Sequence, residues 1–104
     1  MPSTSLVATW RVNPGRGADF VNNVAEAKKL HLKMGVDAVY VSNTVAGANP
    51  GSIVYMMVFE STEKFGKFAD SLSTHAEWQA FWTKTQQNPS AVLVDQSMYS
   101  DLGM

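Results

Sequence analysis

The amino-acid sequence predicts an α+β fold in which a four-stranded antiparallel sheet carries helices on one face. The first observation is Ile53–Phe59, a run of seven apolar residues between a Pro-Gly turn and the polar pair Glu60-Ser61. The run is too short to span a bilayer, and its β-branched and aromatic residues favour a strand. Both faces of that strand are apolar, so both must be covered. The second observation is that strand and helix periods follow one another along the chain in the order β-α-β-β-α-β.

The first predicted strand covers residues 6–12, and its alternation puts Trp10 on the same face as Leu6 and Ala8. Asn13-Pro14-Gly15 ends it, because Pro lacks a ladder donor and Gly accepts positive φ. A helical period then runs over about residues 17–34, before Gly35. The apolar sector of this helix should face the sheet, and it contains Phe20, Val24, Ala27 and His31, with Met34 at its edge.

The next two strands are predicted to form a hairpin. Residues 36–45 alternate as a strand, and the loop 46–52, rich in Gly, Asn and Pro, should fold them back onto Ile53–Phe59.

The second helical region is predicted as two pieces joined by a kink. Ser61 or Thr62 can cap the first piece, and Thr74 with Glu77 has the form of a capping box that opens the second. Trp78, Phe81 and Trp82 lie on one side of the second piece. Residues 91–100 give the last strand, with Val92, Val94, Gln96 and Met98 predicted on one face.

Right-handed crossovers place both helical regions on one face of the sheet, with Ile53–Phe59 central, in a ferredoxin-like arrangement. The 104 residues form a single domain, 1–104. The other face of the sheet keeps apolar side chains and has no helix left to cover it, which is typical of an interface. The simplest cover is the same face of a second copy. We therefore expect a homodimer built as a dimeric α+β barrel.

Three stretches carry a resemblance to a known family. Residues 6–12 followed by Val12-Asn13-Pro14-Gly15 and Phe20 resemble the opening of the dimeric α+β barrel superfamily, which includes antibiotic-biosynthesis-monooxygenase-like and NIPSNAP-like small proteins. Residues 60–65 and 78–81 resemble its later strand-to-helix step and second-helix pattern. The resemblance spans nearly the whole chain and implies the fold. It does not choose among monooxygenases, cyclases, isomerases and members without assigned activity.

The haem-degrading members of that superfamily use an Asn on the first strand and a His on the second helix. By resemblance, these positions fall at or near Ala8 and near Trp82, so both polar groups are missing. We expect no haem degradation by that mechanism. The quinone-oxidising members need no metal or organic cofactor, so their chemistry is compatible with a sequence that contains no cofactor motif, and we expect no cofactor.

Composition limits the partners of the protein. No cysteine is present, which excludes disulfides and thiolate metal sites. Eight basic and nine acidic residues are spread along the chain, so a nucleic-acid partner is not expected. No apolar run has the length of a membrane span, so we expect no membrane partner and a cytoplasmic protein. Two histidines far apart along the chain do not predict a metal site.

His31 is the candidate catalytic residue, because it lies in the apolar sector of the first helix and points at the sheet. A buried imidazole favours its neutral form and can serve as a base or a polar anchor. The alternative is a core histidine paired with a tyrosine hydroxyl or a carbonyl. Strand alternation does not decide which sheet face meets the helices. The predicted walls of a ligand pocket around His31 are Trp10, Tyr40, Tyr55, Trp78 and Trp82.

Two functions remain open from the sequence. The first is a metal-free monooxygenase or an isomerase- or cyclase-like enzyme that acts on a small aromatic or polyketide-like metabolite. The alternative is a non-enzymatic ligand-binding or accessory dimer. An open cavity that reaches His31 favours the first, and an imidazole sealed in packing with both nitrogens paired favours the second.

Overall fold

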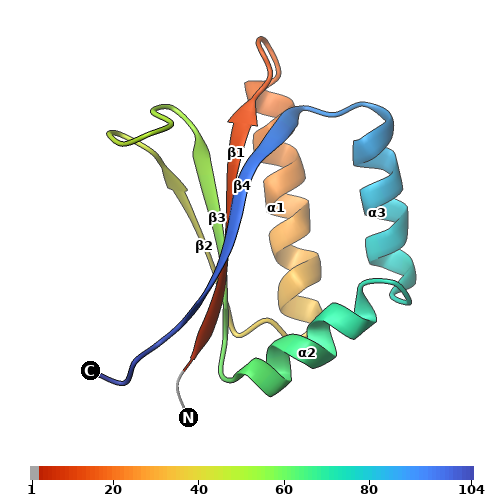
Figure 1. Cartoon of the computed structure of the whole chain (residues 1–104). Helices are drawn as coiled ribbons and strands as arrows, with labels where there is room; N and C mark the ends of the chain where they lie inside the picture. The colour runs from red at the N-terminus through yellow and green to blue at the C-terminus, as the bar shows by residue number, and fades with distance from the viewer. Residues whose placement is uncertain (1–2) are drawn as a thin grey trace.

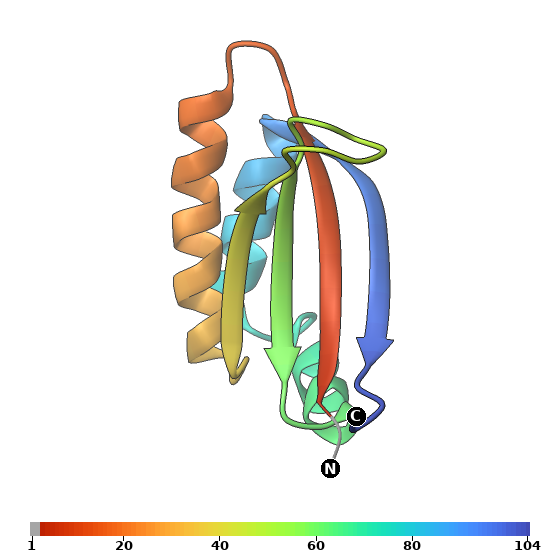
Figure 2. The same ribbon diagram turned by 90° about the vertical axis from the view of Figure 1, so that its left-hand side faces the viewer.

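The computed structural model describes residues 3–104 and forms one sheet with three helices beside it (Figure 1). The sheet is antiparallel with strand order β2-β3-β1-β4. All three helices lie on the same face (Figures 1 and 2). The elements in chain order are β1 (Thr4–Val12), α1 (Gly17–Lys33), β2 (Ala38–Asn43), β3 (Ile53–Phe59), α2 (Thr62–Ser71), α3 (Ala76–Gln87) and β4 (Ala91–Ser100). The predicted fold class and the central place of Ile53–Phe59 are confirmed.

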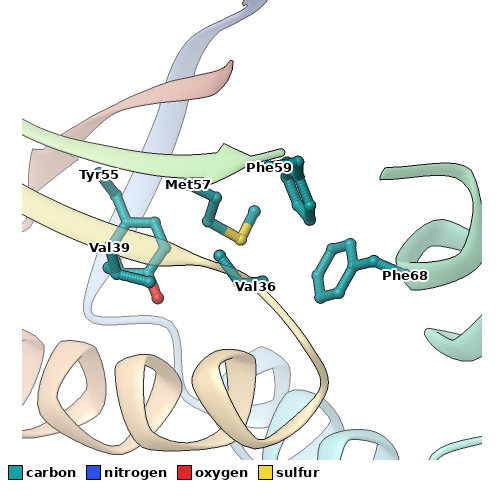
Figure 3. Packing of buried hydrophobic residues seen from close by; sticks show 6 residues of the cluster. All are labelled: Val36, Val39, Tyr55, Met57, Phe59 and Phe68. Atoms are coloured by element: carbon teal, nitrogen blue, oxygen red, sulfur yellow. The ribbon is translucent and has the colours of Figure 1, made fainter. Parts of the chain in front are cut away.

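The core lies between the central strand β3 and the helices. Tyr55, Met57 and Phe59 point from β3 toward the helices, and the Phe59 side chain is completely buried (Figure 3). The register pairs Ala8 of β1 with Tyr55, so the face of β1 that carries Trp10 also looks toward the helices. Val36, Val39 and Phe68 complete the central cluster. The structure thus decides the sheet orientation that the sequence left open.

Two local predictions are corrected by the structure. The second strand is shorter than residues 36–45, because Val36 turns into the core directly after α1, where its N–H donates to the carbonyl of His31 at 3.1 Å.

The cap of α3 is His75 instead of Thr74, and its Nδ1 accepts from the Trp78 backbone N–H at 3.3 Å. The capping box of Thr74 and Glu77 is therefore not formed. The first cap is as predicted, since Ser61 Oγ accepts from the Lys64 N–H.

Strand β4 contains a bulge that breaks its predicted alternation. Asp95 pairs with Thr9 and Leu93 pairs with Trp10, so Val94 is an extra residue between two paired positions. The bulge moves the following residues by one position relative to the sheet faces. Val92 and Gln96 consequently lie on opposite faces, and the prediction that they share one is wrong.

The second face of the sheet has no helix over it within residues 3–104 (Figure 2). Its centre is formed by partly buried aliphatic side chains of β1 and β3, namely Val7, Val54, Met56 and Val58. Tyr40 of β2 and Tyr99 of β4 flank them and are more than half exposed. In residues 3–104, no helix is both long and apolar enough to cross a bilayer.

Candidate ligand-binding site

A cavity of about 110 Å³ lies between α1, α3 and the helix-facing side of the sheet. Its wall is almost entirely apolar and contains six aromatic residues: Trp10, Phe20, Tyr55, Trp78, Phe81 and Trp82. Helix α1 contributes one face at helical spacing, from Asn23 through Val24 and Ala27 to His31. An apolar, aromatic-walled space with few polar groups is typical of a small-molecule site.

Helix α3 forms its wall from aromatic residues on one side of the helix. Trp78 and Trp82 are four residues apart and stack with ring centroids 5.8 Å apart. Phe81 packs beside Trp78, with centroids at 5.4 Å, and is buried. On the opposite wall, Trp10 of β1 contacts Phe20 of α1 at 6.1 Å. Aromatic rings of α1, α3 and β1 therefore line the cavity.

His31 is the main polar side chain at the inner end of this space. Its side chain is buried, with only 5% of its surface exposed, and its ring lies 4.4 Å from the ring of Trp78. Its Nδ1 lies 2.7 Å from the Tyr55 hydroxyl, which is a short and well-formed hydrogen bond. Helix α1 and strand β3 therefore place an imidazole and a phenol in direct contact at the cavity wall.

Burial controls the charge of both groups. Desolvation lowers the pKa of His31 from 6.5 to about 4, because the cationic imidazolium is not solvated there. Desolvation also raises the pKa of Tyr55 above its usual value of 10, because the phenolate is disfavoured. At neutral pH the pair is uncharged, and each partner can donate or accept one hydrogen bond.

The second ring nitrogen of His31, Nε2, has no hydrogen-bond partner among residues 3–104. Every side-chain nitrogen or oxygen that is fully buried in these residues does have a hydrogen-bond partner. Nε2 therefore keeps accessible surface, and His31 lines the cavity. The imidazole is anchored through one nitrogen and available through the other, so it is not sealed in packing.

The rim of the cavity is held by residues that the sequence analysis did not single out. Asn23 Nδ2 donates to Ser90 Oγ at 3.2 Å, which links α1 to the start of β4. Arg16 donates to the carbonyls of Asn88 and Pro89 at 3.3 and 3.2 Å. Asn23 could have been found, because it lies three residues after Phe20 and four before Ala27 on the same helix face. The contacts of Arg16 with Asn88 and Pro89 gave no local signal, since these two partners lie more than seventy residues away.

The structure brings together His31, Trp10, Tyr55, Trp78 and Trp82 at this cavity. Tyr40 does not belong to it. Its partner in the register is Met56, whose side chain is on the opposite face of β3 from Tyr55, and Tyr40 is 55% exposed. The prediction of Tyr40 as a pocket wall is corrected by this register. His75 caps α3 away from the cavity lining. In residues 3–104, no three His, Cys, Asp or Glu side chains are grouped to hold a metal ion.

Comparison with known proteins identifies the fold. No protein-family model and no curated protein sequence matches this chain. Solved structures do match it over nearly its whole length. SnoaB, a cofactor-independent oxygenase from Streptomyces nogalater, is 12% identical with a TM-score of 0.70, and the match covers 96% of this chain and 93% of SnoaB. The chain shares the ferredoxin-like α+β fold of this structure.

Two further structures of this fold connect it with both groups that the sequence resembles. A Chloroflexus aurantiacus protein with the provisional name antibiotic biosynthesis monooxygenase is 17% identical with a TM-score of 0.66, covering 98% of this chain and 95% of its own. A NIPSNAP family protein of unknown function from Agrobacterium tumefaciens is 16% identical with a TM-score of 0.65, covering 95% and 87%. At these identities the likeness establishes the ferredoxin-like α+β fold and no activity.

Proposed function

We propose that this protein binds a single-ring aromatic metabolite in the cavity, with His31 as its polar anchor, and acts on it without a metal. The observation that carries the proposal is the uncommitted Nε2 of His31 at the inner end of an aromatic-walled cavity. A ring enters the apolar part, and a hydroxyl on that ring reaches Nε2. Polar groups placed in this way fix the orientation of a ligand.

The size of the cavity narrows the ligand class. An apolar cavity of about 150 Å³ is known to take up benzene, and the space here is about 110 Å³. One ring therefore fills it, and further parts of the ligand extend through the rim. Among small aromatic and polyketide-like compounds, the volume favours one ring over several fused rings.

The chemistry of the pair supports an uncharged hydrogen-bonding site. When Tyr55 donates its hydroxyl proton to Nδ1, Nε2 carries the proton and donates to the ligand. When Nδ1 donates instead, Nε2 presents a lone pair and can accept the proton of a ligand hydroxyl. The second tautomer suits a first step in which a phenol is converted to its phenolate. SnoaB, which shares the fold, is a cofactor-independent oxygenase.

The alternative is a binding protein without turnover, and one observation favours it. The pKa of His31, about 4, makes its imidazole a weak base toward a phenol. In that case Nε2 only orients the ligand.

We also propose that the protein forms a homodimer through the uncovered face of the sheet. The aliphatic centre of that face, which includes Val54 and Met56, has no cover within residues 3–104. A second copy presents the same apolar surface through a two-fold axis.

Binding can be tested by titrating phenol and toluene against the protein while following tryptophan fluorescence, because Trp78 and Trp82 line the cavity. The test variant is His31→Phe, which keeps a ring in place, and the control is Lys29→Gln on the exposed side of α1. We expect His31→Phe to weaken phenol binding about tenfold and to leave toluene binding unchanged, since one hydrogen bond is lost. Equal phenol affinity in the wild type and in His31→Phe would contradict the proposal. So would a wild type that binds neither phenol nor toluene.

Turnover is tested separately by oxygen uptake and product analysis with hydroquinone under air. Protein-dependent consumption that disappears in His31→Phe and persists in Lys29→Gln supports the metal-free oxygenase. Binding of phenol without any conversion of hydroquinone, or of isomerisable ring compounds, supports the non-enzymatic alternative.

A further inference from the structure

The mouth of the cavity opens beside a second hollow with a different chemical character. This outer hollow has a volume of about 330 Å³ and is lined by Arg16, Asp19, Asn22, Asn23, Lys84, Thr85 and Asn88. Asn23 and Thr85 line both spaces, so the two adjoin. The start of α1 and the end of α3, which carry these residues, lie at the same end of the molecule (Figure 1). A ligand that extends from the inner cavity past Asn23 and Thr85 therefore meets groups that are polar or charged.

Of the three charged side chains in the outer hollow, two form an ion pair with each other and the third, within residues 3–104, does not. Arg16 Nε donates to Asp19 at 2.7 Å, and its two terminal nitrogens donate to Asn88 and Pro89. These bonds neutralise Asp19 and use four of the five guanidinium N–H groups. Lys84 makes no ion pair or hydrogen bond with any residue from 3 to 104. The hollow therefore has one uncompensated positive charge.

Two of the remaining polar side chains, Asn22 and Asn88, add hydrogen-bond donors to the hollow. The Oδ1 atom of Asn88 accepts from Arg16, which leaves its amide N–H₂ available. Thr85 donates its hydroxyl to the carbonyl of Trp82 at 2.9 Å, so its oxygen can only accept. Asn22 offers a second amide N–H₂ group. A cation with amide donors beside it matches a carboxylate, which only accepts hydrogen bonds.

The two spaces are close enough for one small molecule. Asn23 and His31 are eight residues apart on α1, which corresponds to about 12 Å along the helix. A ligand of one aromatic ring with a short side chain is of comparable length.

We propose that the ligand of this site is a monocyclic aromatic acid, whose ring occupies the inner cavity and whose carboxylate lies in the outer hollow beside Lys84. This inference rests on the proposed function and names the substrate class of that site. It also excludes arylalkylamines, because their ammonium group would meet the uncompensated charge of Lys84.

The test uses 3-phenylpropanoate, its uncharged amide and 3-phenylpropylamine as probes, each titrated by tryptophan fluorescence at low salt. We expect the acid to bind at least about fivefold more tightly than the amide, with the amine weakest. Lys84→Gln should reduce the preference for the acid over the amide to less than about twofold, and Lys84→Arg should retain it. Lys29→Gln, which removes a positive charge elsewhere on the surface, should leave the preference unchanged.

The outcomes separate this inference from the proposed function. If phenol and the amide bind but the acid has no advantage, or if its advantage survives Lys84→Gln, the acid class is wrong while the aromatic site stands. If no ring compound binds at all, both the site and the acid class are wrong.

Discussion

At the scale of single residues, His31 combines burial, an anchored nitrogen and a free one. Its contact with Tyr55 is the part that a sequence can least specify. Three tyrosines lie on predicted strands, and only the register decides which hydroxyl comes within 2.7 Å of Nδ1. Tyr55 is chosen because it alternates to the helix side of β3, whereas its neighbours Val54 and Met56 alternate away.

Burial of His31 also predicts how the stability of the protein depends on pH. The pKa of His31 is 6.5 in the unfolded chain and about 4 in the folded protein. Between these pH values the unfolded chain binds more protons, so the free energy of unfolding falls as the pH is lowered from 6.5 to 4. The pKa difference is worth at most about 3 kcal/mol.

Urea unfolding measured from pH 4 to pH 7 checks this, with His31→Gln as the comparison. The variant should show a flatter dependence on pH than the wild type. The pKa values of Asp37 and Glu77 are lowered by their partners Lys64 and Lys33, but these carboxylates are present in both proteins and cancel in the difference. Parallel curves for the two proteins would show that His31 is not buried in its neutral form.

At the scale of single elements, the cap of α3 in the structure differs from the cap that the sequence pattern predicts. The spacing of Thr74 and Glu77 fits a capping box, but the chain has already turned at Ser73 and Thr74, whose hydroxyls donate to carbonyls of the preceding turn. His75 is then the residue with extended φ and ψ angles, and it provides the cap.

This assignment predicts opposite results for two neighbouring substitutions. His75→Ala should lower the free energy of unfolding by about 0.5–1 kcal/mol, because the Trp78 N–H loses its acceptor. Thr74→Ala should change the free energy of unfolding by less than His75→Ala does, because the Thr74 hydroxyl does not cap α3. Urea unfolding at pH 7 measures the free energy of unfolding of both variants. A larger decrease for Thr74→Ala than for His75→Ala would contradict the assignment of His75 as the cap and support the capping box.

At the scale of the whole molecule, the uncovered face of the sheet predicts the assembly. Wild-type protein should sediment as a dimer at micromolar concentration. Met56→Glu places a charge at the centre of the proposed interface, and the two-fold axis repeats it in the second copy. The dissociation constant should rise at least about 100-fold, because an unpaired buried charge is worth about 3 kcal/mol or more.

Val45→Glu is the control for the dimer experiment, because Val45 lies in the β2–β3 loop and is 88% exposed. It should remain dimeric. A monomeric wild type, or a Met56→Glu variant that still sediments as a dimer, would contradict assembly through this face.

The sequence alone determined the order of strands and helices, the central place of Ile53–Phe59 and the inward sector of α1 that carries His31. These features follow from periodicities within one element, which neighbouring residues fix by themselves. The tertiary structure decided the sheet face of Tyr40 and Tyr55, the bulge at Val94, and the meeting of Arg16 with Asn88. Each of these depends on how two distant segments align, and a shift of one residue reverses which side chains meet.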